Sequence, residues 1–322
     1  MSRQQLNAIQ SDTSVKTILG YFGTGKTTVG RLLLEDKRFS TAIYVVFSKT
    51  ANNSLLQEDV KKNFRSKNEN CNLLTFSRSE CLKYFNIKDE DDGMNLINKI
   101  MESPKMDKDM SILFDEVPLS RPVGGQGQYN WSLLKNPKPN SLLIVSFQPM
   151  VEAKNRNTNP IKPILPYPQH ANIELTRCYR TSVSVFDSLE SIKHLGIKMI
   201  KTIPERVTFV SGGTPSKMNY KEPSNVLKTW IHFKLVQLNC NKDNVKILYT
   251  DNTKDDAEEL FKGSDFSCGH WKTFIGSEVP VVVCFYSSEL DHPYILLNMT
   301  SRTQQQVFYK FCSIKIIYLC SF

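Results

Sequence analysis

The sequence predicts an α/β protein with two lobes, each containing a mainly parallel sheet flanked by helices. Short β-branched or apolar runs alternate with segments of helical periodicity, as they do in parallel α/β folds. This alternation occurs twice, and the stretch TNPIKPILPYPQ at 158–169 lies between the two series. Its four prolines are typical of an extended connector. We therefore expect a first lobe over residues 1–172 and a second lobe over residues 173–322.

Composition excludes several classes of protein. The chain has 322 residues, 40% of them hydrophobic and 23% charged, as in ordinary globular proteins. It contains no run of about 18 apolar residues and no apolar core near its amino terminus, so we expect no membrane segment and a cytoplasmic or nuclear location. The eight cysteines form no Cys-x-x-Cys pair, which favours reduced thiols over disulfides. A net charge of +9 is compatible with polyanion binding and equally with a solvated basic surface.

The first lobe begins with a strand, a glycine-rich loop and a helix. The strand-like run VKTIL at 15–19 precedes GYFGTGKTT at 20–28, and apolar residues at helical spacing follow. The loop matches the phosphate-binding pattern G-x-x-x-x-G-K-[ST]. In such a loop the backbone N–H groups cradle phosphate oxygens, Lys26 would reach the β- and γ-phosphates, and the Thr27 hydroxyl would hold Mg²⁺. The alternative is a glycine-rich turn with a surface lysine.

An acidic pair ends a later strand of the same lobe. Apolar, β-branched or aromatic runs predict further strands at 41–47, 72–76, 110–114 and 141–147. The third of these runs, MSILF, continues directly into Asp115 and Glu116. Downstream of a phosphate loop, Asp115 would hold Mg²⁺ and Glu116 would orient or deprotonate the attacking water. Gln148, after the last strand, could touch the γ-phosphate or its water. The alternative for the acids is a helix cap.

The second lobe repeats the alternation. Helices are expected around 186–189 and 255–261, and strands at 245–249 and 279–285. A strand followed by a turn is expected over 206–215, and one last strand within 307–322. The sequence Cys268-Gly269-His270 has no second ligand pair nearby, so it is a weak indication of a metal site.

Further short motifs lie along nearly the whole chain. Besides GYFGTGKTT, Phe114-Asp115-Glu116 and Gln148, they are Gln5–Ile9, Thr75-Phe76, Tyr179–Ser182, Thr273–Glu278 and Thr300–Arg302. In this order they resemble the motifs of the superfamily 1 helicases, most nearly the UvrD-type branch. By that resemblance Gln5–Ile9 is the adenine-reading Q motif, GYFGTGKTT motif I, Thr75-Phe76 motif Ic and Phe114-Asp115-Glu116 motif II. Gln148 is then motif III, Tyr179–Ser182 motif IV, Thr273–Glu278 motif V and Thr300–Arg302 motif VI.

The resemblance implies two RecA-like P-loop NTPase lobes with ATP and Mg²⁺ between them. Arg180 and Arg302 would act as arginine fingers on the γ-phosphate, beside the catalytic Glu116 and Gln148. The residues expected to bind ATP are Gln5, Gly20, Gly23, Thr24, Gly25, Lys26, Thr27, Thr28 and Glu278. A single strand of DNA or RNA would contact Ser48, Lys49, Thr50, Thr75, Phe76 and Ser77, through phosphates and base stacking.

Three departures from the family pattern affect the motifs that couple ATP to nucleic acid. Ser146-Phe147 replaces the Gly-Asp of motif III, Ile275 replaces a lysine in motif V, and Lys49-Thr50 replaces a Pro-Thr. The ATP-contacting residues match better than the strand-contacting ones. An ATPase coupled to single-stranded nucleic acid is therefore the first interpretation. A nucleotide-switched signalling or scaffold ATPase that ignores nucleic acid is the alternative.

Overall fold

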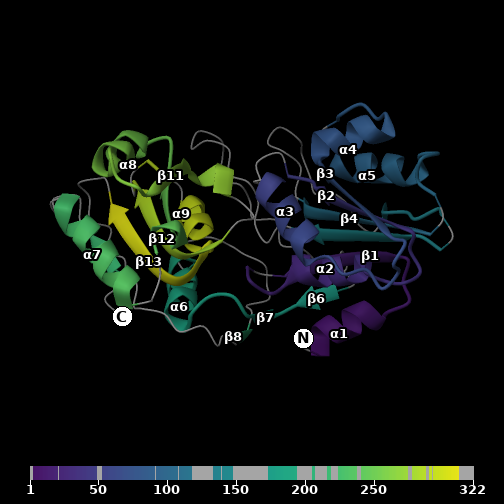
Figure 1. Ribbon diagram of the computed structural model, residues 1–322, viewed down its shortest axis with the longest axis horizontal. Helices are drawn as coiled ribbons and strands as arrows, with labels where there is room; N and C mark the ends of the chain where they lie inside the picture. Colours follow the sequence, from purple (N-terminus) through teal and green to yellow (C-terminus); the bar gives the residue numbers. More distant parts are fainter. Residues whose placement is uncertain are drawn as a thin grey trace. The chain divides into compact units, whose positions relative to one another are not determined.

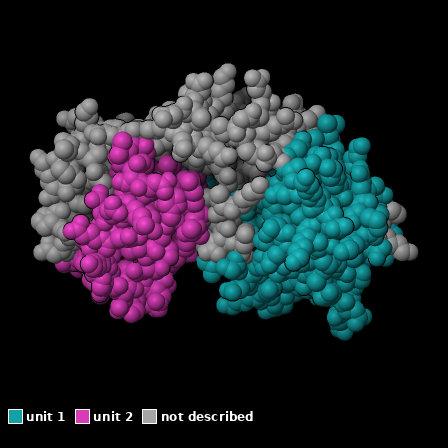
Figure 2. All heavy atoms as spheres, turned by 90° about the horizontal axis from the view of Figure 1, so that it is seen from above, with its two compact units in different colours: residues 1–152, 163–178, 199–205 teal, residues 153–162, 179–198, 206–322 magenta. Residues whose placement is uncertain are grey.

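The helices and strands are shown in Figure 1, a computed structural model of the chain. It describes residues 3–20, 22–48, 53–90, 92–107, 109–117, 133–138, 140–147, 173–193, 205–206, 216–218, 224–237, 241–274, 278–287, 290–291 and 293–311. These residues divide into two compact units, coloured separately in Figure 2. Unit 1 contains the described residues up to 147, 173–178 and residue 205, and unit 2 contains those at 179–193 and from 206 onward.

Unit 1 is built on a six-stranded parallel sheet in the order β3-β2-β4-β5-β1-β6. Its central strands are continuous apolar runs because helices bury both of their faces. The five strands predicted for this lobe are confirmed. The strands are β1 (Val15–Gly20), β2 (Thr41–Val46), β3 (Asn72–Ser77), β4 (Met110–Val117), β5 (Leu142–Phe147) and β6 (Ile173–Leu175).

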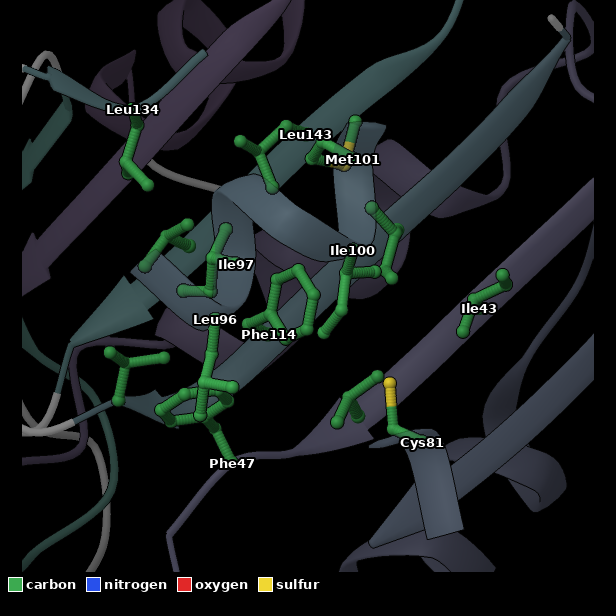
Figure 3. Close-up of a cluster of buried hydrophobic side chains, with 14 of the residues drawn as sticks. Ile43, Phe47, Cys81, Leu96, Ile97, Ile100, Met101, Phe114, Leu134 and Leu143 are labelled. Atoms are coloured by element: carbon green, nitrogen blue, oxygen red, sulfur yellow. The ribbon is translucent and has the colours of Figure 1, made fainter. Parts of the chain in front are cut away.

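Helices cover both faces of this sheet. On one face, α4 (Arg78–Phe85) and α5 (Gly93–Glu102) pack apolar side chains against β2, β4 and β5, as Figure 3 shows. The opposite face carries α2 (Lys26–Leu34), whose backbone lies close to β4: a Cβ added at Gly30 would stand 2.7 Å from Leu113 Cδ2. The remaining helices are α1 (Arg3–Gln10) and α3 (Asn53–Asn63).

The first unit extends further along the chain than the sequence predicts. The expected boundary places Ile173–Leu175 in the second lobe, whereas β6 pairs with β1 through Ile18 and Ile173. Unit 1 therefore continues to Cys178. A three-residue run carries too little pattern to reveal its sheet, because its assignment rests on a pairing more than a hundred residues away.

Unit 2 contains a five-stranded parallel sheet in the order β11-β10-β12-β13-β9. Ile231, Phe261 and Phe285 belong to the core that α7 and α8 form with one face of this sheet. On the other side, α6 contacts α9 and β13. The elements are β9 (Ser216–Met218), β10 (Val245–Tyr249), β11 (Ser267–His270), β12 (Val279–Tyr286), β13 (Thr303–Phe311), α6 (Val183–Lys193), α7 (Ser224–Gln237), α8 (Lys254–Phe261) and α9 (Pro293–Thr300).

The predicted fold class is confirmed: the described chain is α/β, with two mainly parallel sheets flanked by helices. A short ribbon of β7 (Arg177–Cys178) and β8 (Glu205–Arg206) is the third sheet of the described residues. Within the described part of the chain, no helix combines the length and the apolar composition needed to cross a bilayer.

Candidate functional site

The residues predicted to bind phosphate and Mg²⁺ lie at the carboxyl edge of the first sheet. The loop leaves β1 at Gly20, and the acidic pair lies at the end of β4. Because all six strands run in parallel, their carboxyl ends meet at one edge, which is where open α/β sheets bind ligands.

The glycine-rich loop has a backbone shape that only glycine adopts easily. Gly23 and Gly25 have φ angles of 68° and 85°, in the left-handed region. A Cβ at Gly25 would lie 2.7 Å from the Gln5 amide nitrogen, and one at Gly20 would lie 2.5 Å from the Thr24 hydroxyl. Gly25 is also the N-cap of α2 and offers no side chain to the N–H groups of the first turn. The positive end of the helix thus faces the loop, as in anion-binding loops.

Helix α1 supports this loop. The Gln5 amide, 7% exposed, donates a hydrogen bond of 3.1 Å to the Thr24 carbonyl. The ammonium of Lys16 fixes the end of α1, with donations of 2.8 Å to the Ala8 carbonyl and 2.6 Å to the Ser11 carbonyl. Burial, with a smaller contribution from Arg38, lowers the pKa of Lys16. The predicted adenine contact of Gln5 stays a prediction.

Neighbouring Gln4 has a different task. Its amide donates to the Thr176 hydroxyl at 2.8 Å and accepts from the Thr176 backbone N–H at 3.1 Å. This two-point contact ties α1 to the chain just after β6. The two adjacent glutamines thus have different partners, Thr176 for Gln4 and the Thr24 carbonyl for Gln5.

Asp115 joins the loop to the end of β4. The Thr27 hydroxyl donates to Asp115 Oδ2 at 2.7 Å, across 88 residues of sequence. The same oxygen accepts from the Tyr44 hydroxyl at 3.1 Å, and Oδ1 accepts from the Glu116 backbone N–H at 3.0 Å. Asp115 is 1% exposed. Hydroxyl and carboxylate oxygens are the ligands that Mg²⁺ prefers, so Thr27 and Asp115 fit the predicted ion.

Tyr44, on β2, is the site residue that sequence reasoning missed. Its ring is fully buried, and that burial raises its pKa well above 10, helped by the negative charge of Asp115. The hydroxyl therefore stays protonated and donates. In the sequence, Tyr44 is one more aromatic residue in an apolar strand, and its partner becomes visible only when β2 pairs with β4.

Glu116 occupies a break in the regular strand. Phe114 pairs with Val145 and Val117 pairs with Phe147, so Asp115 and Glu116 together stand opposite the single residue Ser146. Such a bulge re-aims side chains, and Glu116 also has a φ of 55°, in the left-handed region. A regular strand would turn Glu116 to the face opposite Asp115. The bulge interrupts this alternation at the predicted general base, which is partly exposed.

The charged residues predicted as site residues in unit 2 gather at the amino edge of its sheet. Glu278 and Arg302 directly precede β12 and β13, whose first residues are paired. The Arg180 guanidinium forms an ion pair of 2.7 Å with Glu278 and donates to the Ser301 carbonyl at 3.4 Å. Arg302, 6% exposed, donates to Asn298 Oδ1 at 3.3 Å. Three segments distant in sequence thus meet here, and their contacts with a nucleotide stay predictions.

The residues predicted to contact nucleic acid are largely engaged within unit 1. Ser77 caps α4 in a capping box with Glu80, whose carboxylate accepts from the Ser77 backbone N–H at 2.7 Å. The ring of Phe76 packs on Tyr84, with centroids 5.1 Å apart. Ser48 is buried, and Thr75 donates to a glutamine side chain on α3 at 3.5 Å. Lys49, Thr50 and Gln148 lie outside the described residues.

No family model and no curated protein matches this sequence. Three solved structures, all viral helicases, share a partial likeness of shape at a TM-score of 0.44 each. The PRRSV helicase is 9% identical, with 96% of this chain and 54% of that chain covered. Arterivirus nonstructural protein 10 (helicase) is 12% identical in its complex with DNA, with 96% and 62% covered, and 12% identical without DNA, with 99% and 64% covered. The chain thus spans less than two thirds of each, and a likeness this low assigns no activity.

Proposed function

We propose that this chain binds ATP and Mg²⁺ at the carboxyl edge of the first sheet and hydrolyses the bound nucleotide. One observation carries the proposal: the hydrogen bond of 2.7 Å between Thr27 and Asp115 joins the phosphate-loop motif to the acidic motif. A surface turn with an unrelated lysine, or an acid that merely caps a helix, would not bring these two side chains together.

Each residue then has a distinct task. The loop amides and Lys26 hold the phosphates, because they supply N–H donors and a positive charge at the end of α2. Thr27 and Asp115 hold Mg²⁺, which neutralises charge on the β- and γ-phosphates when it is bound. Glu116 takes a proton from the attacking water. With a base for water in place, hydrolysis is favoured over transfer to another acceptor.

Lys26→Ala tests the site. We expect nucleotide affinity to fall at least about tenfold and turnover at least about 100-fold, since a charge-assisted contact with the phosphates is lost. Lys37→Ala is the matched control, because Lys37 is exposed and lies before the amino end of β2, at the opposite edge of the sheet. Binding by fluorescent nucleotide titration and phosphate release measure the two effects. Equal turnover in Lys26→Ala and Lys37→Ala would refute the proposal.

Coupling to a single strand of DNA or RNA is the second part of the proposal. It is supported by the motif resemblance and by the net charge of +9. The test is ATP turnover with and without single-stranded DNA or RNA over a range of salt. We expect stimulation that declines as salt rises, because phosphate contacts release counterions.

The alternative is a nucleotide-switched ATPase that acts on a protein partner and ignores nucleic acid. A specific observation favours it: Phe76 and Ser77 are already committed to packing and capping on α4. Turnover that is unchanged by either nucleic acid, together with the absence of salt-sensitive binding, would select this alternative.

A further inference from the structure

The motifs do not assign any role to Tyr44. It lies in the middle of β2, where both neighbouring strands hold it: Tyr44 pairs with Thr75 on β3 and with Leu113 on β4. Asp115 is two residues beyond Leu113 on the same strand, so the two side chains are diagonal neighbours. A long aromatic side chain can reach across such a diagonal, and the Tyr44 hydroxyl lies 3.1 Å from Asp115 Oδ2.

Asp115 Oδ2 therefore accepts hydrogen bonds from two hydroxyl groups, which different parts of the fold hold in place. Thr27 belongs to the first turn of α2, beside the loop that must admit the nucleotide. Tyr44 is 0% exposed and belongs to the sheet itself. Its position is consequently fixed by strand pairing and core packing and does not depend on the state of the loop.

Asp115 Oδ1 accepts from the neighbouring Glu116 backbone N–H, within the bulge. Without Tyr44, Oδ2 would be held from the loop alone and would lose its partner whenever the loop moved. The Tyr44 hydroxyl gives Oδ2 a donor on the sheet and leaves the carboxylate oriented before the ion arrives. Preorganisation of this kind raises affinity because less order has to be imposed on binding.

We propose that Tyr44 is a positioning residue, whose hydroxyl holds the Asp115 carboxylate in the orientation that binds Mg²⁺ together with Thr27. This inference rests on the proposed function, because it assigns a support to the same Mg²⁺ site. It adds a residue outside every motif of the sequence and separates Mg²⁺ affinity from nucleotide affinity.

Tyr44→Phe tests the role, since it removes one hydroxyl and keeps the ring. The experiment titrates MgCl₂ against binding of a fluorescent ATP analogue, after a first measurement of nucleotide affinity in EDTA. We expect the Mg²⁺ concentration at half-saturation to rise about tenfold, as expected from the loss of one hydrogen bond to a charged group. Affinity in EDTA should stay within about twofold of the unmodified chain.

Tyr309→Phe is the matched control. Tyr309 is also buried, 3% exposed, and its hydroxyl accepts from Thr300 at 3.2 Å in unit 2. Removal of this hydroxyl should lower the thermal midpoint by about as much as Tyr44→Phe does and should leave the Mg²⁺ concentration at half-saturation unchanged.

The outcomes separate the two proposals. If the unmodified chain and Tyr44→Phe show the same Mg²⁺ midpoint, the positioning role is overturned and the ATP site stands. The same holds if Tyr309→Phe raises the midpoint as much as Tyr44→Phe, because the effect is then general destabilisation. If the unmodified chain binds the analogue with no dependence on Mg²⁺, the Mg²⁺ site of the proposed function fails, and the role of Tyr44 fails with it.

Discussion

Among the described residues, a buried aspartate lies at the carboxyl edge of each sheet, and the two aspartates have different partners. In unit 1, Asp115 Oδ2 accepts from two hydroxyl groups, those of Thr27 and Tyr44. In unit 2, Asp291 is 2% exposed and accepts from the Thr250 hydroxyl at 2.9 Å, the Asn252 amide at 2.7 Å and the Ser287 backbone N–H at 2.8 Å.

The difference indicates that the carboxyl edges of the two sheets have different roles. The three partners of Asp291 belong to the segments after β10 and after β12, so Asp291 ties these two segments together. The Thr27 hydroxyl that contacts Asp115 belongs instead to the first turn of α2, next to the glycine-rich loop, so this pair can ligate a cation beside that loop. Unit 1 has a glycine-rich loop at this edge, whereas the predicted charged residues of unit 2 lie at its amino edge. We infer that the first edge is built for a ligand and the second for stability.

The largest expected effect concerns Glu116, in the bulge at the carboxyl edge of the first sheet. Among the described residues, it is the one strand residue whose φ lies in the left-handed region. Glu116→Gln keeps the shape of the side chain and removes the proposed general base, so we expect turnover to fall by about 10²- to 10⁴-fold. Nucleotide affinity should stay unchanged, because the substituted amide side chain would still fill the bulge.

Phosphate release and nucleotide titration on the same preparation check this. Glu116→Gly is the companion variant: glycine tolerates the left-handed φ, so this chain should gain about 1 kcal/mol in free energy of unfolding while it loses turnover. Full turnover in either variant would remove Glu116 from the mechanism and leave the bulge without a catalytic purpose.

The two aspartates give the second prediction. Asp115→Asn should lower turnover at least about 100-fold, because the proposed Mg²⁺ site loses its carboxylate. Asp291→Asn should leave a donor facing donors and lower the free energy of unfolding by about 2 kcal/mol. Chemical denaturation and phosphate release on both variants measure the pattern. If Asp291→Asn reduces turnover as strongly as Asp115→Asn while the chain stays folded, the contrast between the edges is wrong.

Local pattern predicts much of the fold. The strands β1, β2, β4, β5, β10 and β12 are runs of apolar and β-branched residues, so their existence follows from the sequence. The helix α5 has apolar residues at Leu96, Ile97 and Ile100, yet a charged turn and Gly93 at its start hide it. The strand β11 (SCGH) is polar and small, and it forms because β10 offers it a parallel partner. Pairing between distant segments is what local pattern lacks.

The same limit applies to the candidate site. The spacing of the phosphate loop and of the Asp-Glu pair predicts Thr27 and Asp115, because these motifs encode their chemistry locally. The contribution of Tyr44 depends on a contact across 71 residues. The bulge at Glu116 depends on the register between β4 and β5. Neither feature has a signal in the residues immediately around it.

The smallest expected effect compares the two cores at alkaline pH. Burial raises the pKa of the Cys81 thiol, in the core of unit 1, from 9.0 to about 12. It raises the pKa of Cys284, on β12 in unit 2, as well. The unfolded chain releases each proton near pH 9 and the folded chain retains it, so the folded state binds more protons between these values. The stability that each thiol contributes is therefore complete below pH 9 and is lost as pH rises from 9 toward 12.

We expect the free energy of unfolding to be lower at pH 10 than at pH 8 by about 1 kcal/mol for each thiol. Denaturant unfolding at both pH values, on the unmodified chain, Cys81→Ala and Cys284→Ala, measures the contributions separately. In each variant the free energy of unfolding should decline less between the two pH values than in the unmodified chain. Because the two units are separate compact bodies, the two reductions should add.

Two other groups also change the free energy of unfolding in this range. Burial of Tyr44 lowers it above pH 10, in the same direction as the thiols, and the lowered pKa of Lys16 acts in the opposite direction below pH 10.5. Neither group is removed in the cysteine variants, so comparison with the unmodified chain isolates the thiols. An unchanged decline in Cys81→Ala would mean that the core under α4 admits water, in contrast to the dry core that Phe47, Leu96 and Phe114 form around it.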